Sequence, residues 1–271
     1  MSDFIMNLFI ASTSSFISSC FCTPIENVPT SILQKSEQKN LSHICRGILT
    51  NTIKYIPHSA LTFAFKDAYS NAFLKKSNDY KNIKNLFLGS LAGVSTMFVI
   101  YPYEYVKSRT TYLQKVVKRT NVQWRDCFIE ILKTNKILGF YKGFGACTFP
   151  IIIFRGLQLG IYDNTKDITQ GLPFIGQLFW VQILTFVSHI ISFPFFKIMI
   201  MMKADSLNFN HKSVRYKNFI DCTNQILKSQ KLIYLFEGSS QKFLLATKDA
   251  MTLILYYNIQ QYFQGKQTYK N

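Results

Sequence analysis

Six long apolar segments alternate with polar, basic connections along the 271-residue chain. They run roughly over residues 4–28, 49–74, 86–113, 147–168, 175–202 and 243–263. Each is near the ~20 residues that an α-helix needs to cross a bilayer, or somewhat longer and therefore tilted. Polar residues interrupt all six, which is typical of helices that turn one face to a polar interior. The pattern predicts an all-α membrane protein with six transmembrane helices.

A threefold internal repeat links these segments. The first, third and fifth segments each contain a proline, at Pro24, Pro102 and Pro194. A charged residue and a glycine follow each proline downstream, in the pairs Arg46-Gly47, Lys142-Gly143 and Glu237-Gly238. The glycines lie ~96 and ~95 residues apart, so the repeat keeps its phase along the chain. The sequence therefore predicts three helix pairs about a pseudo-threefold axis, in repeats spanning residues 1–78, 79–172 and 173–271.

Composition and charge agree with a membrane protein that has basic loops. Hydrophobic residues make up 48% of the chain and charged residues 17%, below the roughly one quarter usual in soluble domains. The net charge of +17 would also suit a nucleic-acid-binding protein. Lys and Arg are, however, concentrated between the apolar segments and do not alternate with stacking aromatics, so we exclude nucleic acid as a partner. Most lie after the first, third and fifth segments, and the positive-inside rule places those loops on one side of the membrane.

The sequence gives no sign of metal or enzyme chemistry. The six cysteines form no CxxC pair and no zinc-type spacing with histidine, so we expect reduced thiols. There is no nucleophile–base pair and no phosphate-binding loop, which excludes an enzyme and a catalytic cofactor. The first apolar segment exceeds signal-peptide length and contains Pro24 and Glu26. We therefore expect it to belong to the mature fold, without a removable presequence.

A GxxxG motif lies in the third apolar segment, at Gly89 and Gly93. Small residues at this spacing let two membrane helices approach each other closely. We expect the third helix to pack against a neighbour through this face.

The repeated pattern Pro-x-acid-x-x-base resembles the signature of the mitochondrial carrier family. The second repeat has it complete, between Tyr101 and Arg109. Three further stretches, Ile56–Asp67, Ile151–Arg155 and Leu159–Asp163, are similar to ADP/ATP carriers in particular. The resemblance covers essentially the whole chain. It implies the mitochondrial carrier fold in the inner mitochondrial membrane, with both termini outside the matrix and with alternating access between two salt-bridge gates.

Only part of the matrix-side gate implied by this resemblance is present. The acid of one repeat should pair with the base of the next, so Glu26 is expected to meet Lys107. Glu104 would need a base where the third repeat has a methionine. Phe196 replaces the third acid, and Pro29 replaces its partner. Because apolar packing in place of a buried ion pair is often neutral or stabilising, by roughly 1–4 kcal/mol, we expect Phe196 against Pro29 to hold the matrix side closed.

The gate on the opposite, cytoplasmic side is similarly incomplete. Its pattern is an acid with a base three residues later, which Asp163 and Lys166 keep. Asp67 is followed at that distance by Ser70, and the third repeat has Asn258 in place of the acid. We therefore expect Asp67, Asp163 and Lys166 to carry what is left of this gate.

The resemblance also implies a substrate site between the gates, to which we assign Lys54, Ile151, Phe154 and Arg155. His189, five residues before the third proline, is expected to face the same cavity. ADP/ATP carriers are expected to have arginine at the first contact, so Lys54 keeps the charge but loses the planar fork that grips phosphate oxygens. His189 is either a satisfied interior histidine or a ligand. Lys54 and Arg155 are either structural charges or a live anion site.

The first repeat is shortened, and it lacks the short matrix helix that residues 125–134 and 217–229 are expected to form in the other two. Members of the family bind cardiolipin near such helices and near the glycine motif, which implies a bound cardiolipin in this protein. The implied lipid contacts are Arg46, Gly47, Lys142 and Gly143.

Two functions agree with this sequence. An active antiporter of adenine nucleotides or another anionic metabolite is favoured by the fold, by Lys54 and Arg155, and by the intact second repeat. A carrier that has lost transport and persists as a structural or accessory subunit of a larger inner-membrane complex, such as one of the respiratory chain, is favoured by the decay of both gates. We favour the second interpretation, with membrane lipids and other inner-membrane subunits as partners.

Overall fold

The computed structural model describes residues 2–33, 41–73, 80–115, 122–207, 216, 218–229, 232–236, 238–239 and 241–268. Side chains are described over 4–22, 55–73, 80–114, 122–205, 216, 218–228, 233–236, 238–239 and 246–263. Within these ranges the regular structure is entirely helical, as the sequence predicts.

Six long helices make up most of the molecule. They are α1 (Ser2–Leu33), α2 (Leu41–Phe73), α3 (Lys81–Lys115), α5 (Phe144–Gln170), α6 (Phe174–Leu207) and α8 (Gln241–Thr268). Two shorter helices, α4 (Trp124–Asn135) and α7 (Phe219–Ser229), are each followed by a 3-10 turn, η2 (Ile137–Tyr141) and η3 (Leu232–Phe236). The six predicted long helices and the two predicted short helices are confirmed.

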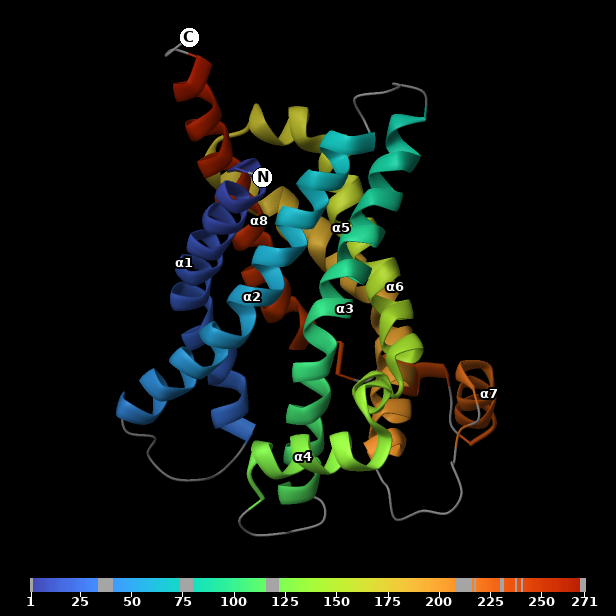
Figure 1. Cartoon of the computed structure of the whole chain (residues 1–271). Helices are drawn as coiled ribbons and strands as arrows, with labels where there is room; N and C mark the ends of the chain where they lie inside the picture. Colours follow the sequence, from blue (N-terminus) through green and yellow to red (C-terminus); the bar gives the residue numbers. More distant parts are fainter. Residues whose placement is uncertain are drawn as a thin grey trace.

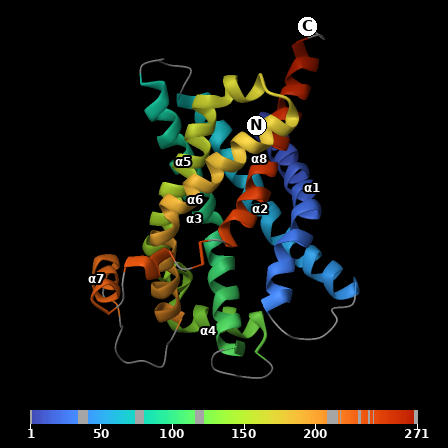
Figure 2. The ribbon, with the colours of Figure 1, turned by 180° about the vertical axis from the view of Figure 1, so that it is seen from behind.

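The long helices form a closed ring. Each contacts its two neighbours in the order α1, α2, α3, α5, α6 and α8, and α8 returns to α1. Both chain ends lie at one end of this ring, which we call the terminal side (Figure 1). Helices α4 and α7 lie at the other end, the loop side, and the view from behind shows the same arrangement (Figure 2). The interior of the ring is therefore lined by residues from all three helix pairs.

The helices differ in how apolar they are. In the described part of the chain, α1, α3, α5 and α6 are long and apolar enough to cross a membrane. Helices α2 and α8 are long enough, at 33 and 28 residues, but they carry charged residues that face the interior of the ring. The outer face of α6 is a row of exposed large apolar side chains: Phe179, Ile183, Val187, Ile190 and Ile191. Such a row is suited to contact with lipid chains.

Glycines bring α3 and α5 close together. A Cβ atom on Gly89 of α3 would lie 2.8 Å from the backbone oxygen of Arg155, which confirms that the predicted GxxxG face packs tightly. Helix α5 has a second pair of glycines at the same spacing, Gly156 and Gly160. A Cβ atom on either of them would meet backbone atoms of Leu86 on α3. Two small-residue faces therefore oppose each other, which gives the close approach that membrane helices achieve without a hydrophobic driving force.

The short helices pack on the loop-side ends of the long ones. Cys127 and Ile131 of α4 are buried in an apolar cluster with Tyr101 and Tyr105 of α3. Residues of α7 and η3 form an equivalent cluster against Ile198 of α6. In the first repeat only residues 34–40 separate α1 from α2, too few for a helix as long as α4, which has 12 residues. The predicted shortening of the first repeat is confirmed. The exact boundaries of the three repeats stay a prediction.

Replacing Gly160 by alanine tests the contact between α3 and α5. The new methyl group would lie 2.5 Å from the Cα of Leu86, so the helices must separate, and we expect a loss of about 1–3 kcal/mol in the free energy of unfolding. Gly145→Ala is the control in the same helix, because no atom lies within 4 Å of its Cβ and alanine favours the helix. Thermal unfolding in detergent measures both, and equal midpoints for the two variants would contradict this packing.

Candidate functional site

Three polar layers lie inside the ring. The first is the terminal network, close to the chain ends, and its members come from α1, α2, α5 and α8. We define it as Asn7, Lys66, Asp67, Asp163, Tyr256, Tyr257 and Gln260. All of these residues are linked by hydrogen bonds or ion pairs.

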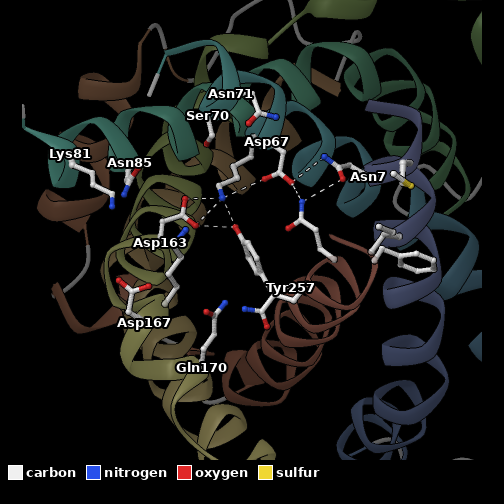
Figure 3. A pocket seen from close by; sticks show the side chains of 17 residues that line it. Asn7, Asp67, Ser70, Asn71, Lys81, Asn85, Asp163, Asp167, Gln170 and Tyr257 are labelled. Carbon is white, nitrogen blue, oxygen red and sulfur yellow. Dashed lines mark hydrogen bonds and ion pairs between the residues drawn. The ribbon is translucent and has the colours of Figure 1, made fainter. Parts of the chain in front are cut away.

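Lys66 is the centre of the terminal network, and it contacts Asp67, Asp163 and Tyr257, which Figure 3 labels. Its Nζ lies 2.8 Å from Oδ2 of Asp163 on α5 and 3.5 Å from Oδ1 of Asp67 beside it on α2. The same ammonium donates a hydrogen bond to the hydroxyl of Tyr257 on α8. Only 6% of the Lys66 side chain is exposed, so its charge depends on these partners. One lysine therefore joins the terminal-side ends of three helices.

Asp67 extends the network to the fourth helix. Its Oδ2 accepts hydrogen bonds from the Tyr256 hydroxyl and, at 2.6 Å, from the amide of Gln260 on α8. Asn7 of α1 donates to the same oxygen at 3.2 Å. A carboxylate with several donors is well satisfied in a buried place, so the contacts hold the terminal side of the ring together.

A pocket of about 590 Å³ lies at the terminal-side end of the network. Figure 3 shows the polar side chains that surround it, and its wall includes three lysines and three aspartates. These six charged residues are Lys66, Lys81, Lys166, Asp67, Asp163 and Asp167. Their formal charges cancel, so the pocket is polar without a net charge.

The sequence identified the acids of this gate but not the base that pairs with them. Asp67 and Asp163 come together as expected. The cation between them is Lys66, four residues before Ser70, where the pattern places the base. Lys166 lines the pocket, and no ion pair is seen for it among the described residues. The sequence did contain one signal for this base, because Lys66 directly precedes Asp67 at the end of the Ile56–Asp67 stretch.

The second layer, the central cluster, lies nearer the loop side. We define it as Tyr55, His58, Phe154, Arg155, His189 and Asp249. Asp249 precedes Tyr257 on α8 by eight residues, which corresponds to ~12 Å of helix. Tyr55 and Arg155 likewise lie on the loop side of their network neighbours on α2 and α5.

The acidic half of the central cluster is built around Asp249. The Tyr55 hydroxyl donates to its Oδ1 at 2.6 Å, and Nε2 of His189 on α6 lies 3.5 Å from its Oδ2. The His189 ring stacks on Phe154, with the ring centres 4.2 Å apart. Lys248 adds a buried cation whose Nζ lies 4.4 Å from the Tyr55 ring centre.

The basic half is Arg155. Its Nη1 donates to the side-chain oxygen of Gln158 at 2.6 Å, and its Nη2 lies 3.4 Å from Nδ1 of His58 on α2. The guanidinium group also lies over the Phe154 ring, 5.0 Å from its centre. Among the described residues, no carboxylate lies within ion-pair distance of this buried guanidinium.

The structure describes the side chains of all the predicted substrate residues except Lys54, and most of these meet in one place. Phe154, Arg155 and His189 come together in the central cluster. Ile151 is buried in the apolar cluster of α3 and α5, with its Cγ2 against Gly93. The side chain of Lys54 lies outside the described residues. Sequence reasoning missed Tyr55 and His58 as members of the cluster, because the convergence of these residues depends on how four helices face one another.

The third layer lies where the matrix-side gate was expected, and the structure corrects one prediction for it. Glu104 of α3 does find a base on α6, because Nζ of Lys203 lies 4.0 Å from its Oε2. Lys203 stands one helical turn after the methionine at the expected position, Met199. Phe196 and Met199 pack instead against the apolar cluster that contains Tyr101. Glu26 lies outside the described side chains, and the pairing of Lys107 with it stays a prediction.

The glycine motif of the second repeat begins helix α5. Gly143 has a φ of 80°, a left-handed conformation that suits glycine, and the Lys142 carbonyl accepts a hydrogen bond of 2.8 Å from Tyr101. The side chain of Arg46 and the surroundings of Gly47 fall outside what the structure describes. Cardiolipin binding at these four residues stays a prediction.

Comparison with known proteins gives one family. A family model described as mitochondrial carrier protein matches residues 78–173. ADP/ATP translocase 4 of Homo sapiens is 32% identical over 228 residues, which cover 80% of this chain and 71% of that protein. ADP,ATP carrier protein 2, mitochondrial, of Zea mays is 29% identical over 299 residues, covering 97% and 76%. The mitochondrial substrate carrier family protein ancA of Dictyostelium discoideum is 26% identical over 294 residues, covering 96% and 94%.

Removing the Lys66 charge should weaken the ring more than removing that of Lys166. In Lys66→Met, Asp163 and Asp67 stay buried without their cation, and we expect a loss of about 3–5 kcal/mol in the free energy of unfolding. Lys166→Met is the matched control on the same pocket, where a partly exposed lysine without an ion pair should cost about 0.5 kcal/mol or less. Denaturation in detergent compares the two, and similar losses would rule out Lys66 as the centre of the network.

Proposed function

Because the chain belongs to the mitochondrial carrier family, we propose that it is a carrier protein whose nucleotide exchange is impaired and that it serves as an accessory subunit of a larger inner-membrane assembly, such as a respiratory-chain complex. Members of this family are multi-pass transporters of the mitochondrial inner membrane and not enzymes. The impaired exchange and the accessory role are the parts that need testing.

One observation carries this proposal: the ring is held by side-chain contacts on both sides in the same conformation. On the terminal side, Lys66 joins α2, α5 and α8. On the loop side, Phe196 and Met199 of α6 pack against an apolar cluster formed by residues of α3, α4, η2 and α5. Alternating access requires one side to open as the other closes. An apolar contact in place of one expected acid leaves fewer ion pairs on this side to re-form after each opening, and Glu104 with Lys203 is one that is kept.

The charges of the central cluster also argue against nucleotide exchange. Asp249 places a carboxylate, 13% exposed, among the residues that would meet a polyphosphate. Two like charges 4 Å apart repel by about 4 kcal/mol at an effective dielectric constant of 20. On α6, the four residues that begin at the expected base position of the gate, Met199, are methionine, isoleucine, methionine and methionine, with no arginine among them. The cluster is therefore a poor match for a ligand with three or four negative charges.

A second candidate function is an active antiporter of another anionic metabolite. The buried guanidinium of Arg155 supports it, because that group has capacity for a carboxylate or phosphate. The outcomes of the next two experiments separate the candidates.

Native size in mitochondria solubilised with a mild detergent tests the accessory role. We expect the protein to migrate with a very large complex and to leave it only on harsher extraction. Migration as a single chain of 31.4 kDa with its lipid and detergent would overturn the accessory role.

Nucleotide exchange in liposomes tests the impairment. We expect the purified full-length chain to exchange labelled ADP no faster than protein-free liposomes. The human ADP/ATP translocase 4, reconstituted in parallel, is the positive control. Exchange at a rate comparable with this control would show that the central cluster accepts a polyphosphate.

A further inference from the structure

We propose that the central cluster binds a small solute that carries both an ammonium group and a carboxylate, the chemistry of a free amino acid. The proposal concerns ligand binding in the interior of the ring. It goes beyond the accessory role and does not rest on it. Two halves of the cluster, one basic and one acidic, carry the argument.

The basic half has an unused capacity for a carboxylate. Arg155 is 7% exposed, and its partners, the Gln158 amide and the His58 ring, are not carboxylates. Buried charges are normally paired with an opposite charge. A guanidinium presents its N–H groups as a planar fork that matches a carboxylate in two places. Asp249 lies in the same cluster but is not within ion-pair distance, so the fork of Arg155 keeps room for a second carboxylate.

The acidic half has an unused capacity for a donor cation. An ionised carboxylate has about four acceptor positions, and Asp249 uses one for the Tyr55 hydroxyl. The 3.5 Å separation from His189 is long for a hydrogen bond. An ammonium group, which is a donor only, can fill the positions that remain.

Buried polar atoms on α6 point to the same region. His189 is 7% exposed, and neither of its ring nitrogens has a hydrogen-bond partner among the described residues. The hydroxyls of Thr185 and Ser192, four residues before and three after it, are buried and unpartnered as well. These three positions share one face of the helix. Buried polar groups normally have hydrogen-bond partners, so a row of unsatisfied ones indicates a place where water or a polar ligand binds.

The two halves are held close together by α2 and Phe154. Tyr55, which contacts Asp249, and His58, which contacts Arg155, are three positions apart and so lie on one face of α2. Phe154 contacts the His189 ring and the Arg155 guanidinium at the same time. Opposite charges fixed at short range match a molecule whose ammonium and carboxylate sit on one carbon atom.

Thermal unfolding of the purified full-length protein in detergent tests the proposal. The probes are the twenty L-amino acids singly, ADP, ATP, succinate and ethylamine, the last two carrying only one kind of charge. We expect at least one L-amino acid to raise the unfolding temperature, while succinate, ethylamine and the nucleotides leave it unchanged. The absence of a shift with every amino acid, or a shift with nucleotides alone, would overturn the proposal.

Two variants link the binding to the cluster. Asp249→Asn keeps the shape and removes the charge, and we expect it to weaken amino-acid binding about tenfold or more in a titration. Tyr55→Phe, which deletes one hydroxyl that orients Asp249, is the second variant if the first does not fold. Gly145→Ala, in open space on α5, should bind as the unaltered chain does. Unchanged binding in Asp249→Asn or, in its place, Tyr55→Phe would refute the role of Asp249.

Discussion

The pairing of buried charges inside a ring of membrane helices is the constraint on which this structure depends. Lys66 is almost fully buried, and its contacts with Asp163, Asp67 and Tyr257 join three helices. A lone charge in such a place would cost several kcal/mol, so the helices must arrive in the one arrangement that pairs it. The glycine faces of α3 and α5 impose a similar condition, because those helices fit only when their small residues meet.

The polar interior is organised in layers with different chemistry. The terminal network is satisfied by its own members, and it closes the ring at that end. The central cluster keeps an arginine without a carboxylate and a histidine without a hydrogen-bond partner among the described residues. The layer at the loop side is mainly apolar, and its ion pair of 4.0 Å lies at its edge. The three layers therefore differ in how far their polar groups are satisfied by partners within the chain.

Two of the expected gate pairs have moved along their helices. Lys66 stands one turn before the position at which the family pattern places a base, and Lys203 stands one turn after it. A long flexible lysine covers such a distance because its side chain spans about one helical turn. A pattern at fixed positions finds both gates incomplete, whereas the three-dimensional arrangement brings Lys66 to Asp67 and Asp163 and brings Lys203 to Glu104. The loss of a motif residue is therefore a weaker sign of lost contact than it seems in the sequence.

The sequence by itself determined the six long helices, the short helices and the shortened first repeat, because hydrophobic length and repeat spacing are local or periodic properties. It also identified Asp67, Asp163, Phe154, Arg155 and His189 as interior residues. Only the tertiary structure decided which cation pairs with which acid, and that Asp249 shares a site with His189 and Tyr55. Those contacts join residues up to 194 positions apart, and they depend on the rotation of each helix about its axis. No local pattern fixes that rotation; the packing of the whole ring does.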